Sequence, residues 1–395
     1  MPKSLIESAL GGAAPTAEGS DSSSDVGRGQ RTKDEIEIEK VANDLSVCIK
    51  LVGCGGAGSN TVNRCIEDKL EGVSTLALNT DAKHLLSVKA GKKMLVGKTL
   101  THGLGAGARP EVGERATMEN EQDIKSYLRD AQIVFVTAGM GGGTGTSSSF
   151  VTARLAKELG TLTIGVVTMP FKSEGELRME NAVQGLSRLS RVCDTTIVIP
   201  NDTLIELVPQ LPVQAAFKVA DELLLQTIRS LTEMLTRAGL VNVDYADLKT
   251  ILNEGGVSLI GVGESDITSG DRMDEAVEEA IDSPLLGKMD LGDARGALIR
   301  VVGGPDMTIE EGARAAEIVT QRVRKDARVI WGCSVEKEME KRVRVLLIAT
   351  GARSQYVLLR EGPDSVMAPT TQDYRGRMNL PPQISKDDDL SVFVR

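Results

Sequence analysis

The chain has 395 residues, of which 41% are hydrophobic, 26% are charged and 3% are aromatic, and its formal net charge is −10. This balance argues against nucleic-acid binding, because phosphate backbones are held by excess Lys and Arg, and unpaired bases stack on aromatic rings. No apolar run reaches the roughly 18 residues of a membrane span, and the N-terminus lacks the apolar core of a secretory signal, so we expect a cytoplasmic protein without direct membrane insertion.

The first domain is predicted to follow a polar tail. Residues 1–44 are rich in Ser and charged side chains, and we expect them to form a flexible tail. Residues 45–213 contain short apolar runs separated by helical stretches, and the runs are SVCIKLVG, STLALNTD, KMLVG, QIVFVTAG, LTIGVVTMP and TTIVIPND. Such runs are typical of parallel strands that are buried on both faces. We therefore predict an α/β fold with a doubly wound, mainly parallel sheet.

A long helix and a smaller domain are predicted next. In residues 214–240, apolar residues recur at steps of three and four, which indicates one amphipathic central helix. Residues 241–353 alternate strand-like runs with two helical stretches, as expected of a second, smaller α+β domain. Residues 354–395 are predicted to form a flexible tail that ends in KDDDLSVFVR, an acidic segment followed by apolar residues.

Three glycine-rich loops stand at or near the ends of predicted strands. They are the first loop GCGGAGSN (53–60), the second loop THGLGAGARPEVG (101–113) and the third loop GMGGGTGTSSS (139–149). Glycines let main-chain N–H groups approach phosphate oxygens, and a following helix directs its positive end at the same anion. Thr144, Thr146 and Ser147 are expected to add hydroxyl donors. Two facing loops therefore predict a triphosphate site rather than a merely flexible Gly/Ser segment.

The first loop alone also fits another class of enzyme. Gly53, Gly55 and Gly58 match G-x-G-x-x-G, and Asp81 lies at the end of the next predicted strand. This is the pattern of a dinucleotide-binding fold, which leaves an NAD(P) oxidoreductase open. Such an enzyme has no evident use for the third loop.

Taken together, the motifs resemble the tubulin/FtsZ family of GTPases. The likeness to FtsZ covers about residues 46–353, and it is supported by NTDAKHL, LGAGARPEVGERA, TMPFKSEGELRMENA, IPNDTL, AAFKVADELL and NVDYADLKTIL. The resemblance implies GTP and GDP as ligands, Mg²⁺ as the cation, head-to-tail homopolymers and an active site completed by two subunits. Some loop residues differ from those usual in bacterial members of the family, and these differences make the chain more similar to archaeal members.

The resemblance also implies roles for individual residues. Those expected to contact the phosphates are Gly55, Gly56, Ala57, Gly58 and Asn60 in the first loop, Gly105, Ala106 and Gly107 in the second, near the γ-phosphate, and Gly141, Gly142, Gly143, Thr144, Gly145 and Thr146 in the third. Those expected around the ribose and guanine are Glu174, Arg178, Asn201, Phe217 and Asp221. Asp81, from the dinucleotide pattern, is kept among the nucleotide-binding candidates.

The chemistry of one of these residues agrees with guanine. Guanine presents N1–H and N2–H₂ as adjacent donors, and a carboxylate such as that of Asp221 accepts from both. Adenine presents no such pair, so this residue favours GTP over ATP. Phe217 lies one helical turn before Asp221 on the same face, where it can pack on the base. From the residues alone, a core role for Phe217 is equally open.

The segment NVDYADL (242–248) is the candidate catalytic stretch. By itself it is more typical of a helix N-cap and a solvated charge. The resemblance instead implies that it meets the nucleotide of the next subunit, where Asp244 and Asp247, with Asn242, orient and polarise the attacking water. A monomer lacks this half-site, so hydrolysis is expected to require polymer.

Two further features bear on function. Ser147 stands where the family usually has Gly, which leaves open a GTP-binding scaffold or regulatory filament with little turnover. The C-terminal KDDDLSVFVR resembles the peptide through which FtsZ binds membrane-tethering division proteins. It implies a SepF-like or FtsA-like partner and a location at the mid-cell division ring.

Overall fold

The computed structural model describes residues 47–207, 213–236, 240–241, 243–253, 256–267, 272–287 and 290–352. The two predicted tails, the C-terminal motif and Asn242 lie outside the described residues. Within the described part of the chain, no helix has the length and apolar character needed to cross a bilayer.

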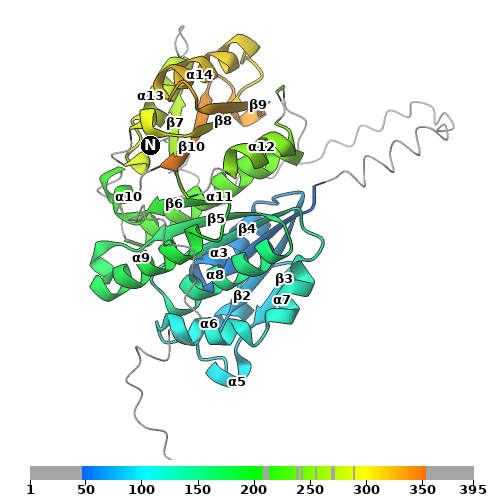
Figure 1. The fold of residues 1–395 in the computed structure, drawn as a ribbon. Coiled ribbons are helices and arrows are strands. Elements are labelled where there is room, and N and C mark those ends of the chain that lie inside the picture. The colour runs from blue at the N-terminus through cyan, green and yellow to red at the C-terminus, as the bar shows by residue number, and fades with distance from the viewer. Residues whose placement is uncertain are drawn as a thin grey trace, which may run out of the picture. The chain divides into compact units, whose positions relative to one another are not determined.

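The amino-terminal half is a parallel α/β unit (Figure 1). Its strands are β1 (Ile49–Cys54), β2 (Val73–Asn79), β3 (Lys92–Leu95), β4 (Ile133–Gly139), β5 (Leu162–Met169) and β6 (Thr195–Pro200). Its helices are α3 (Gly55–Glu67), α4 (Ala82–Ser87), α5 (Lys98–Thr101), α6 (Pro110–Met118), α7 (Glu121–Leu128), α8 (Gly143–Glu158), α9 (Glu176–Ser190) and α10 (Asn201–Leu207). All the strands pair in parallel in the order β3-β2-β1-β4-β5-β6, which confirms the predicted fold class.

The carboxyl-terminal half extends the same sheet. Its elements are α11 (Val213–Thr236), α12 (Tyr245–Leu252), β7 (Val257–Ser265), α13 (Arg272–Ile281), β8 (Gly296–Gly303), α14 (Ile309–Arg322), β9 (Arg328–Val335) and β10 (Val343–Ala352). The order continues β6-β7-β10-β8-β9, with β10 antiparallel to β7 and β8. The β6–β7 junction is narrow, because only Thr196 with Val257 and Ile197 with Ser258 pair there. The two halves are therefore joined by a short ladder and by α11.

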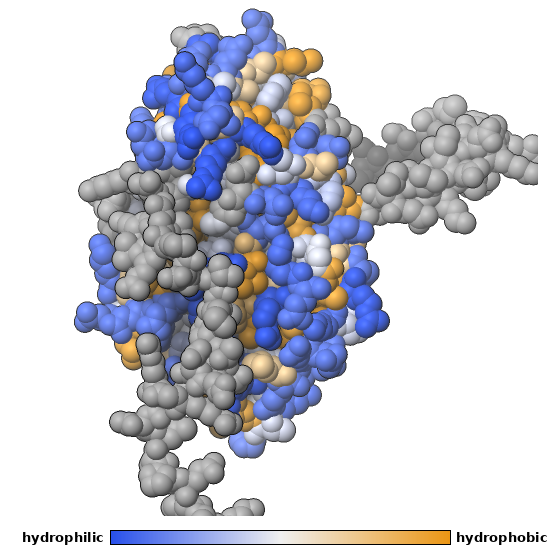
Figure 2. All heavy atoms as spheres, in the orientation of Figure 1, coloured by the Kyte–Doolittle hydropathy of each residue, from blue (hydrophilic) through white to orange (hydrophobic). Residues whose placement is uncertain are grey.

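Two apolar layers cover the two faces of the sheet. Alternate residues of β1 show the division, since Ile49 and Leu51 belong to one core cluster and Val52 and Cys54 to the other. The first layer is closed by α3, α11 and α12, and the second by α7, α8, α9, α13 and α14. Burial on both faces explains why the strands read as continuous apolar runs. On the face seen in Figure 2, hydrophilic residues are interspersed with smaller hydrophobic patches.

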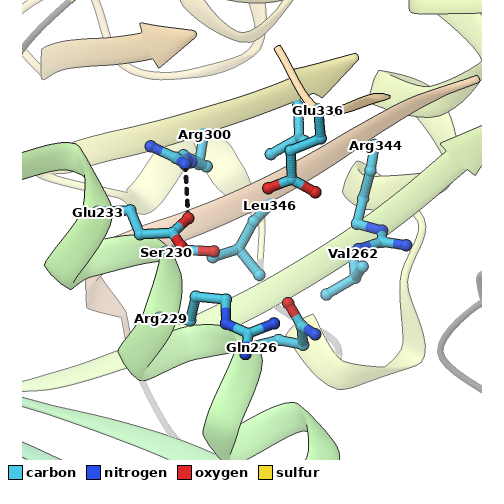
Figure 3. A pocket seen from close by; sticks show the side chains of 10 residues that line it. Gln226, Arg229, Ser230, Glu233, Val262, Arg300, Glu336, Arg344 and Leu346 are labelled. Atoms are coloured by element: carbon cyan, nitrogen blue, oxygen red, sulfur yellow. Dashed lines mark hydrogen bonds and ion pairs between the residues drawn. The ribbon is translucent and has the colours of Figure 1, made fainter. Parts of the chain in front are cut away.

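The helix α11 is held against the second half by a buried ion pair. Arg300 on β8 donates to Glu233 on α11 over 3.0 Å, and both side chains are less than a tenth exposed. A cavity of about 50 Å³ opens beside this pair, between α11 and strands β7, β8 and β10 (Figure 3). None of the predicted site residues lines this cavity. The candidate nucleotide site lies elsewhere, at the three glycine-rich loops.

Candidate nucleotide-binding site

The three glycine loops meet at one edge of the sheet. The first and third loops follow the carboxyl ends of β1 and β4, which are neighbouring parallel strands. Gly55 has φ +70°, and a Cβ atom there would lie 2.6 Å from the nitrogen of Gly145. A Cβ atom on Gly143 would lie 2.8 Å from the nitrogen of Arg109. Only glycine permits these approaches, so the third loop touches both of the others.

The open side of the loops presents main-chain groups. A Cβ atom added at Gly56, Gly105, Gly107 or Gly142 would meet no other atom within 4 Å. Helices α3 and α8 both begin at these loops, and neither has a side-chain N-cap. Their first N–H groups therefore lack side-chain capping partners, and both helix dipoles direct positive charge to the same place. This arrangement is suited to a polyphosphate.

The hydroxyls of the third loop are used differently from the sequence expectation. Thr144 Oγ1 lies 2.7 Å from Thr80 Oγ1. Thr146 Oγ1 accepts a hydrogen bond from the N–H of Gly141 at 2.9 Å, which braces the loop internally. Ser147 is 2% exposed, and its hydroxyl donates to the carbonyl of Gly143 one helical turn back at 2.7 Å. The expectation that Ser147 donates to phosphate is therefore wrong, because a hydroxyl has a single proton.

Asp81 and Asn60 are joined through His84. Asp81 caps α4, since its Oδ1 accepts from the N–H of His84 at 3.0 Å. The ring Nε2 of His84 lies 3.1 Å from Oδ1 of Asn60, which is exposed at the start of α3. Asp81 thus has a local structural role at the end of β2, and Asn60 stays exposed as the last residue of the first loop.

Glu174 and Arg178 form a pair next to the third loop. Glu174 accepts from the N–H of Phe171 at 2.9 Å and forms an ion pair with Arg178. The main chain of Arg178 abuts Gly141, where a Cβ atom would lie 2.7 Å from the Arg178 carbonyl oxygen. The pair is therefore placed beside the phosphate loops, where ribose is expected.

An aromatic and an amide stand further along the same edge. The ring of Phe217 is 41% exposed and meets that of Phe171 edge-on, with 5.0 Å between the centroids. Phe217 is therefore not a core residue, and its exposed part is available to a planar base. Asn201 follows the carboxyl end of β6 and is 4% exposed, and its Oδ1 has no hydrogen-bond partner among the described residues. Such an unpaired acceptor is costly unless a ligand donor satisfies it.

Asp221 carries a perturbed carboxyl group. Burial, with a smaller contribution from Glu222, raises its pKa to about 6, against the opposing effect of Arg64. Arg64 of α3 forms an ion pair with Glu222 and donates to the carbonyl of Lys218, which fixes this turn of α11 beside α3. The described residues offer the Asp221 carboxylate no hydrogen bond. A partly desolvated, unpaired carboxylate is typical of a ligand-binding position.

The candidate catalytic stretch lies at the opposite edge of the sheet. Asp244 caps α12 through the N–H of Ala246 at 3.3 Å, and Asp244 and Asp247 are both exposed. The next residue, Tyr245, donates to the carbonyl of Gln132, immediately before the first residue of β4. The glycine loops follow the last residue of β4, about 20 Å away along seven residues of strand. In Figure 1, α12 and α5–α6 accordingly lie at opposite ends of these strands.

The residues around the glycine loops suit a cation that is bound mainly by the phosphates of the nucleotide. The described residues contain no cluster of three or more His, Cys, Asp or Glu side chains placed to hold a metal ion. Mg²⁺ in nucleotide sites is commonly bound by substrate phosphates, waters and one or two protein oxygens. The hydroxyl of Thr144 and the open loops fit that arrangement, with the phosphates as the main ligands.

Comparisons with known proteins agree with this geometry. Residues 48–209 match the Tubulin/FtsZ family, GTPase domain, and residues 256–353 match the FtsZ family, C-terminal domain. The chain is 46% identical over 360 residues to Cell division protein FtsZ 1 of Archaeoglobus fulgidus, covering 91% of this chain and 96% of that protein. It is 49% identical over 322 residues to Cell division protein FtsZ 1 of Methanocaldococcus jannaschii, covering 82% and 88%.

The chain belongs to the tubulin/FtsZ family. A solved FtsZ dimer of M. jannaschii, without ligand, superposes with a TM-score of 0.77 at 46% identity, covering 82% of this chain and 93% of that one. Family membership confirms the predicted GTPase class and guanine nucleotides as ligands. It does not favour an NAD(P) oxidoreductase. Two residues beside the nucleotide site, Phe171 and Thr80, were not predicted from the sequence. The position of Thr80 directly before Asp81, at the end of a strand, is a signal that could have identified it.

Proposed function

We propose that this chain hydrolyses GTP as a filament-forming division protein, with each active site completed by two copies. One copy supplies the three glycine loops and the guanine-binding residues, and the next supplies Asp244 and Asp247. The chain would assemble head to tail, because a contact between unlike faces that does not close into a ring generates a filament. The dimer in the M. jannaschii structure supports self-association of relatives.

The proposal of an active site shared by two copies rests on the distance between the glycine loops and α12. The loops lie at the carboxyl edge of β1 and β4, and α12 lies at the amino edge of β4. No side chain spans the length of β4, about 20 Å, so Asp247 cannot reach a nucleotide held by its own copy. A second copy stacked on the first along the strand direction would bring the two edges together.

The proposed reaction transfers the γ-phosphoryl group to water. The water oxygen forms a bond to Pγ while the bond from Pγ to the β–γ bridging oxygen breaks, giving GDP and phosphate. Asp244 and Asp247, assisted by Asn242, would orient the water and accept its proton. The uncapped N-termini of α3 and α8 would stabilise the phosphate charge. Mg²⁺, when bound, supplies neutralisation of the β- and γ-phosphate oxygens.

We assign the selection of guanine to the residues that lie further along the sheet edge from the phosphate loops. Asp221 would accept from N1–H and N2–H₂, the ring of Phe217 would lie on the base, and Asn201 would use its unpaired Oδ1. Glu174 and Arg178 would contact the ribose side. The unsatisfied acceptor of Asn201 and the desolvated carboxylate of Asp221 support this assignment.

The cellular role follows from the family. Relatives that match most of this chain are cell division proteins, so we propose assembly into a ring at the division site in mid-cell. Attachment to the membrane would be indirect, through a SepF-like or FtsA-like tether that binds the C-terminal KDDDLSVFVR. The domain limits of 45–213, 214–240 and 241–353 are retained as proposals.

The decisive experiment measures GTP turnover per subunit against protein concentration, with Mg²⁺ and with ATP as the control nucleotide. Turnover that rises only above a threshold concentration, and only with GTP, is expected. Turnover per subunit that is independent of concentration would mean a self-contained site and would overturn the shared-site proposal. GTP binding without turnover at any concentration would instead identify a scaffold filament.

Matched variants separate charge from structure at Asp244. Asp244→Asn keeps an N-cap residue but removes the carboxylate, so it should retain GTP binding and folding and lose turnover at least about 100-fold. Asp290→Asn is the control, because Asp290 also caps a short helix through the N–H of Gly292 in the same half of the chain. Full turnover by Asp244→Asn would contradict the catalytic assignment.

A further inference from the structure

Thr80 occupies an enclosed position between two of the phosphate loops. It follows the last residue of β2, and its side chain is fully buried, with 0% exposure. Its N–H donates to Oδ1 of Asn79 at 2.8 Å, which holds the backbone of this turn. None of the roles proposed above uses this residue.

The hydroxyl of Thr80 has one hydrogen-bond acceptor within reach among the described residues. Its oxygen lies 2.7 Å from Oγ1 of Thr144, and no other side-chain or main-chain acceptor for it is found among the described residues. A buried hydroxyl proton left without an acceptor is costly. Thr80 therefore donates to Thr144, which leaves the proton of Thr144 free to point outward. Thr144 is 9% exposed, whereas Thr80 is 0% exposed, so of the two residues only Thr144 has any contact with the space outside the loops.

The carbonyl of Thr80 holds the second loop. It accepts from the N–H of Gly105 at 3.1 Å, and the hydroxyl of Thr101 approaches it at 3.5 Å. Gly105 begins the three-residue segment expected at the γ-phosphate. One buried residue thus holds the second loop by its main chain and Thr144 of the third loop by its side chain.

We infer that Thr80 is a positioning residue that couples the γ-phosphate segment of the second loop to the hydroxyl of Thr144. This inference rests on the proposed function. A γ-phosphate that engages Gly105–Gly107 fixes the main chain of Thr80, and Thr80 in turn fixes the direction in which Thr144 donates. GDP lacks the γ-phosphate and cannot use this link, so the coupling contributes to discrimination between GTP and GDP.

The test compares Thr80→Val with Thr80→Ser. Valine has nearly the same shape as threonine but no hydroxyl, whereas serine restores it. Dissociation constants for GTP and GDP are measured below the assembly concentration, with thermal unfolding to verify the fold. Thr80→Val should weaken GTP binding about three- to tenfold and GDP binding less than about twofold, as expected for one hydrogen bond. Thr80→Ser should lie within about twofold of wild type for both.

Two further variants separate coupling from general destabilisation. Adding Thr80→Val to Thr144→Val should change GTP binding by less than about twofold, because the partner hydroxyl is already absent. Thr195→Val is the matched control, since Thr195 and Ser258 form a fully buried hydroxyl pair of 2.6 Å between β6 and β7, away from the loops. It should leave the ratio of GTP to GDP affinity unchanged.

The outcomes are distinguishable. Equal weakening of GTP and GDP by Thr80→Val, no weakening of either, or full additivity with Thr144→Val would overturn the inference while leaving the proposed function intact. Wild-type protein that binds no guanine nucleotide would overturn both.

Discussion

The phenol oxygen of Tyr245 donates a hydrogen bond of 3.4 Å to the main-chain carbonyl of Gln132. The same carbonyl accepts from the N–H of Leu162, and the side chain of Gln132 accepts from the N–H of Cys48 at 2.7 Å. Gln132 therefore ties together the amino ends of β1, β4 and β5, and Tyr245 attaches α12 to that point. Burial, followed by the charge of Asp194, raises the pKa of Tyr245, so the phenol stays a donor.

Removing this hydroxyl should loosen the proposed catalytic helix. Tyr245→Phe is expected to lower the free energy of unfolding by about 0.5–1 kcal/mol and to slow GTP turnover about two- to fivefold, with GTP affinity unchanged. Denaturant unfolding and steady-state turnover check the two effects. Tyr127→Phe is the control, because the buried Oη of Tyr127 has no hydrogen-bond partner among the described residues. Equal effects of the two substitutions would show that the Tyr245 hydrogen bond has no specific role.

Asp221 should make nucleotide binding depend on pH. Its pKa is raised to about 6, and only the ionised carboxylate accepts from both guanine donors. GTP affinity should therefore rise with pH and level off above about pH 7, and at pH 5 it should be about tenfold weaker. Asp221→Asn should bind more weakly and lose this dependence. Titrations of GTP between pH 5 and 8 check it, and an unchanged slope in Asp221→Asn would assign the titration to another group.

The same carboxyl group has the opposite effect on the ligand-free fold. Its folded pKa lies above the ordinary Asp value of 3.8, so the folded state binds more protons between about pH 4 and pH 6. The contribution of Asp221 to the free energy of unfolding should fall as pH rises through this window. Denaturant unfolding without nucleotide, compared between wild type and Asp221→Asn, measures the contribution. If the unfolding free energy of wild type minus that of Asp221→Asn does not fall between about pH 4 and pH 6, the expectation is contradicted.

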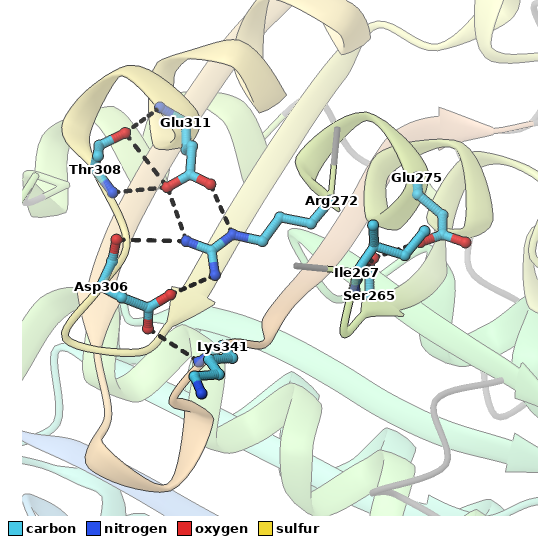
Figure 4. A network of polar contacts seen from close by, with 8 residues as sticks. All are labelled: Ser265, Ile267, Arg272, Glu275, Asp306, Thr308, Glu311 and Lys341. Carbon is cyan, nitrogen blue, oxygen red and sulfur yellow. Dashed lines mark hydrogen bonds and ion pairs between the residues drawn. The ribbon is translucent and has the colours of Figure 1, made fainter. Parts of the chain in front are cut away.

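Arg272 should stabilise the carboxyl-terminal half. Its guanidinium is paired with both carboxylate oxygens of Glu311 at 2.7 and 3.0 Å and also with Asp306 (Figure 4). The main-chain N–H of Lys341, followed by Arg272, lowers the pKa of Asp306 to about 2, and Arg272 lowers that of Glu311. Arg272→Met should cost about 1–3 kcal/mol near neutral pH.

The loss of unfolding free energy caused by Arg272→Met should depend on pH with a definite sign. Carboxyl groups with lowered folded pKa values contribute stability above their unfolded values, and this contribution disappears as pH falls from about 4.5 towards 2. The difference between wild type and Arg272→Met should shrink over the same range. Arg314→Met is the comparison, because Arg314 pairs with Asp274 between the same two helices but is 47% exposed, so its loss should be smaller. Denaturant unfolding at pH 3 and pH 7 measures both.

Ser147 should matter for stability and not for chemistry. Its hydroxyl is turned inward to Gly143, so Ser147→Gly loses that hydrogen bond and places glycine inside α8. The expected loss is about 1 kcal/mol of unfolding free energy, with GTP turnover at the assembly plateau within about twofold of wild type. Ser147→Ala isolates the hydrogen bond from the glycine effect. A large change in turnover with an unchanged melting temperature would restore a catalytic role for this position.

The local structure of the chain could be predicted from its amino-acid sequence. Apolar runs between helical stretches predicted the strands from Ile49 to Ala352, and the glycine loops predicted a phosphate site at strand ends. Residue types also indicated that Asp221 suits guanine. These features depend on neighbours within a few positions, through side-chain periodicity, main-chain freedom at glycine and the donor or acceptor chemistry of one side chain.

The placement of these parts could be read only from the folded chain. It joined both halves into one sheet through the β6–β7 ladder, set α12 at the edge of β4 opposite the loops, turned Ser147 inward and brought Thr80 to Thr144. Strand order and such contacts depend on pairing between residues far apart in the chain, and many arrangements bury the same local pattern equally well. The direction of a hydroxyl is decided last, by whichever acceptor the packed neighbours leave within reach.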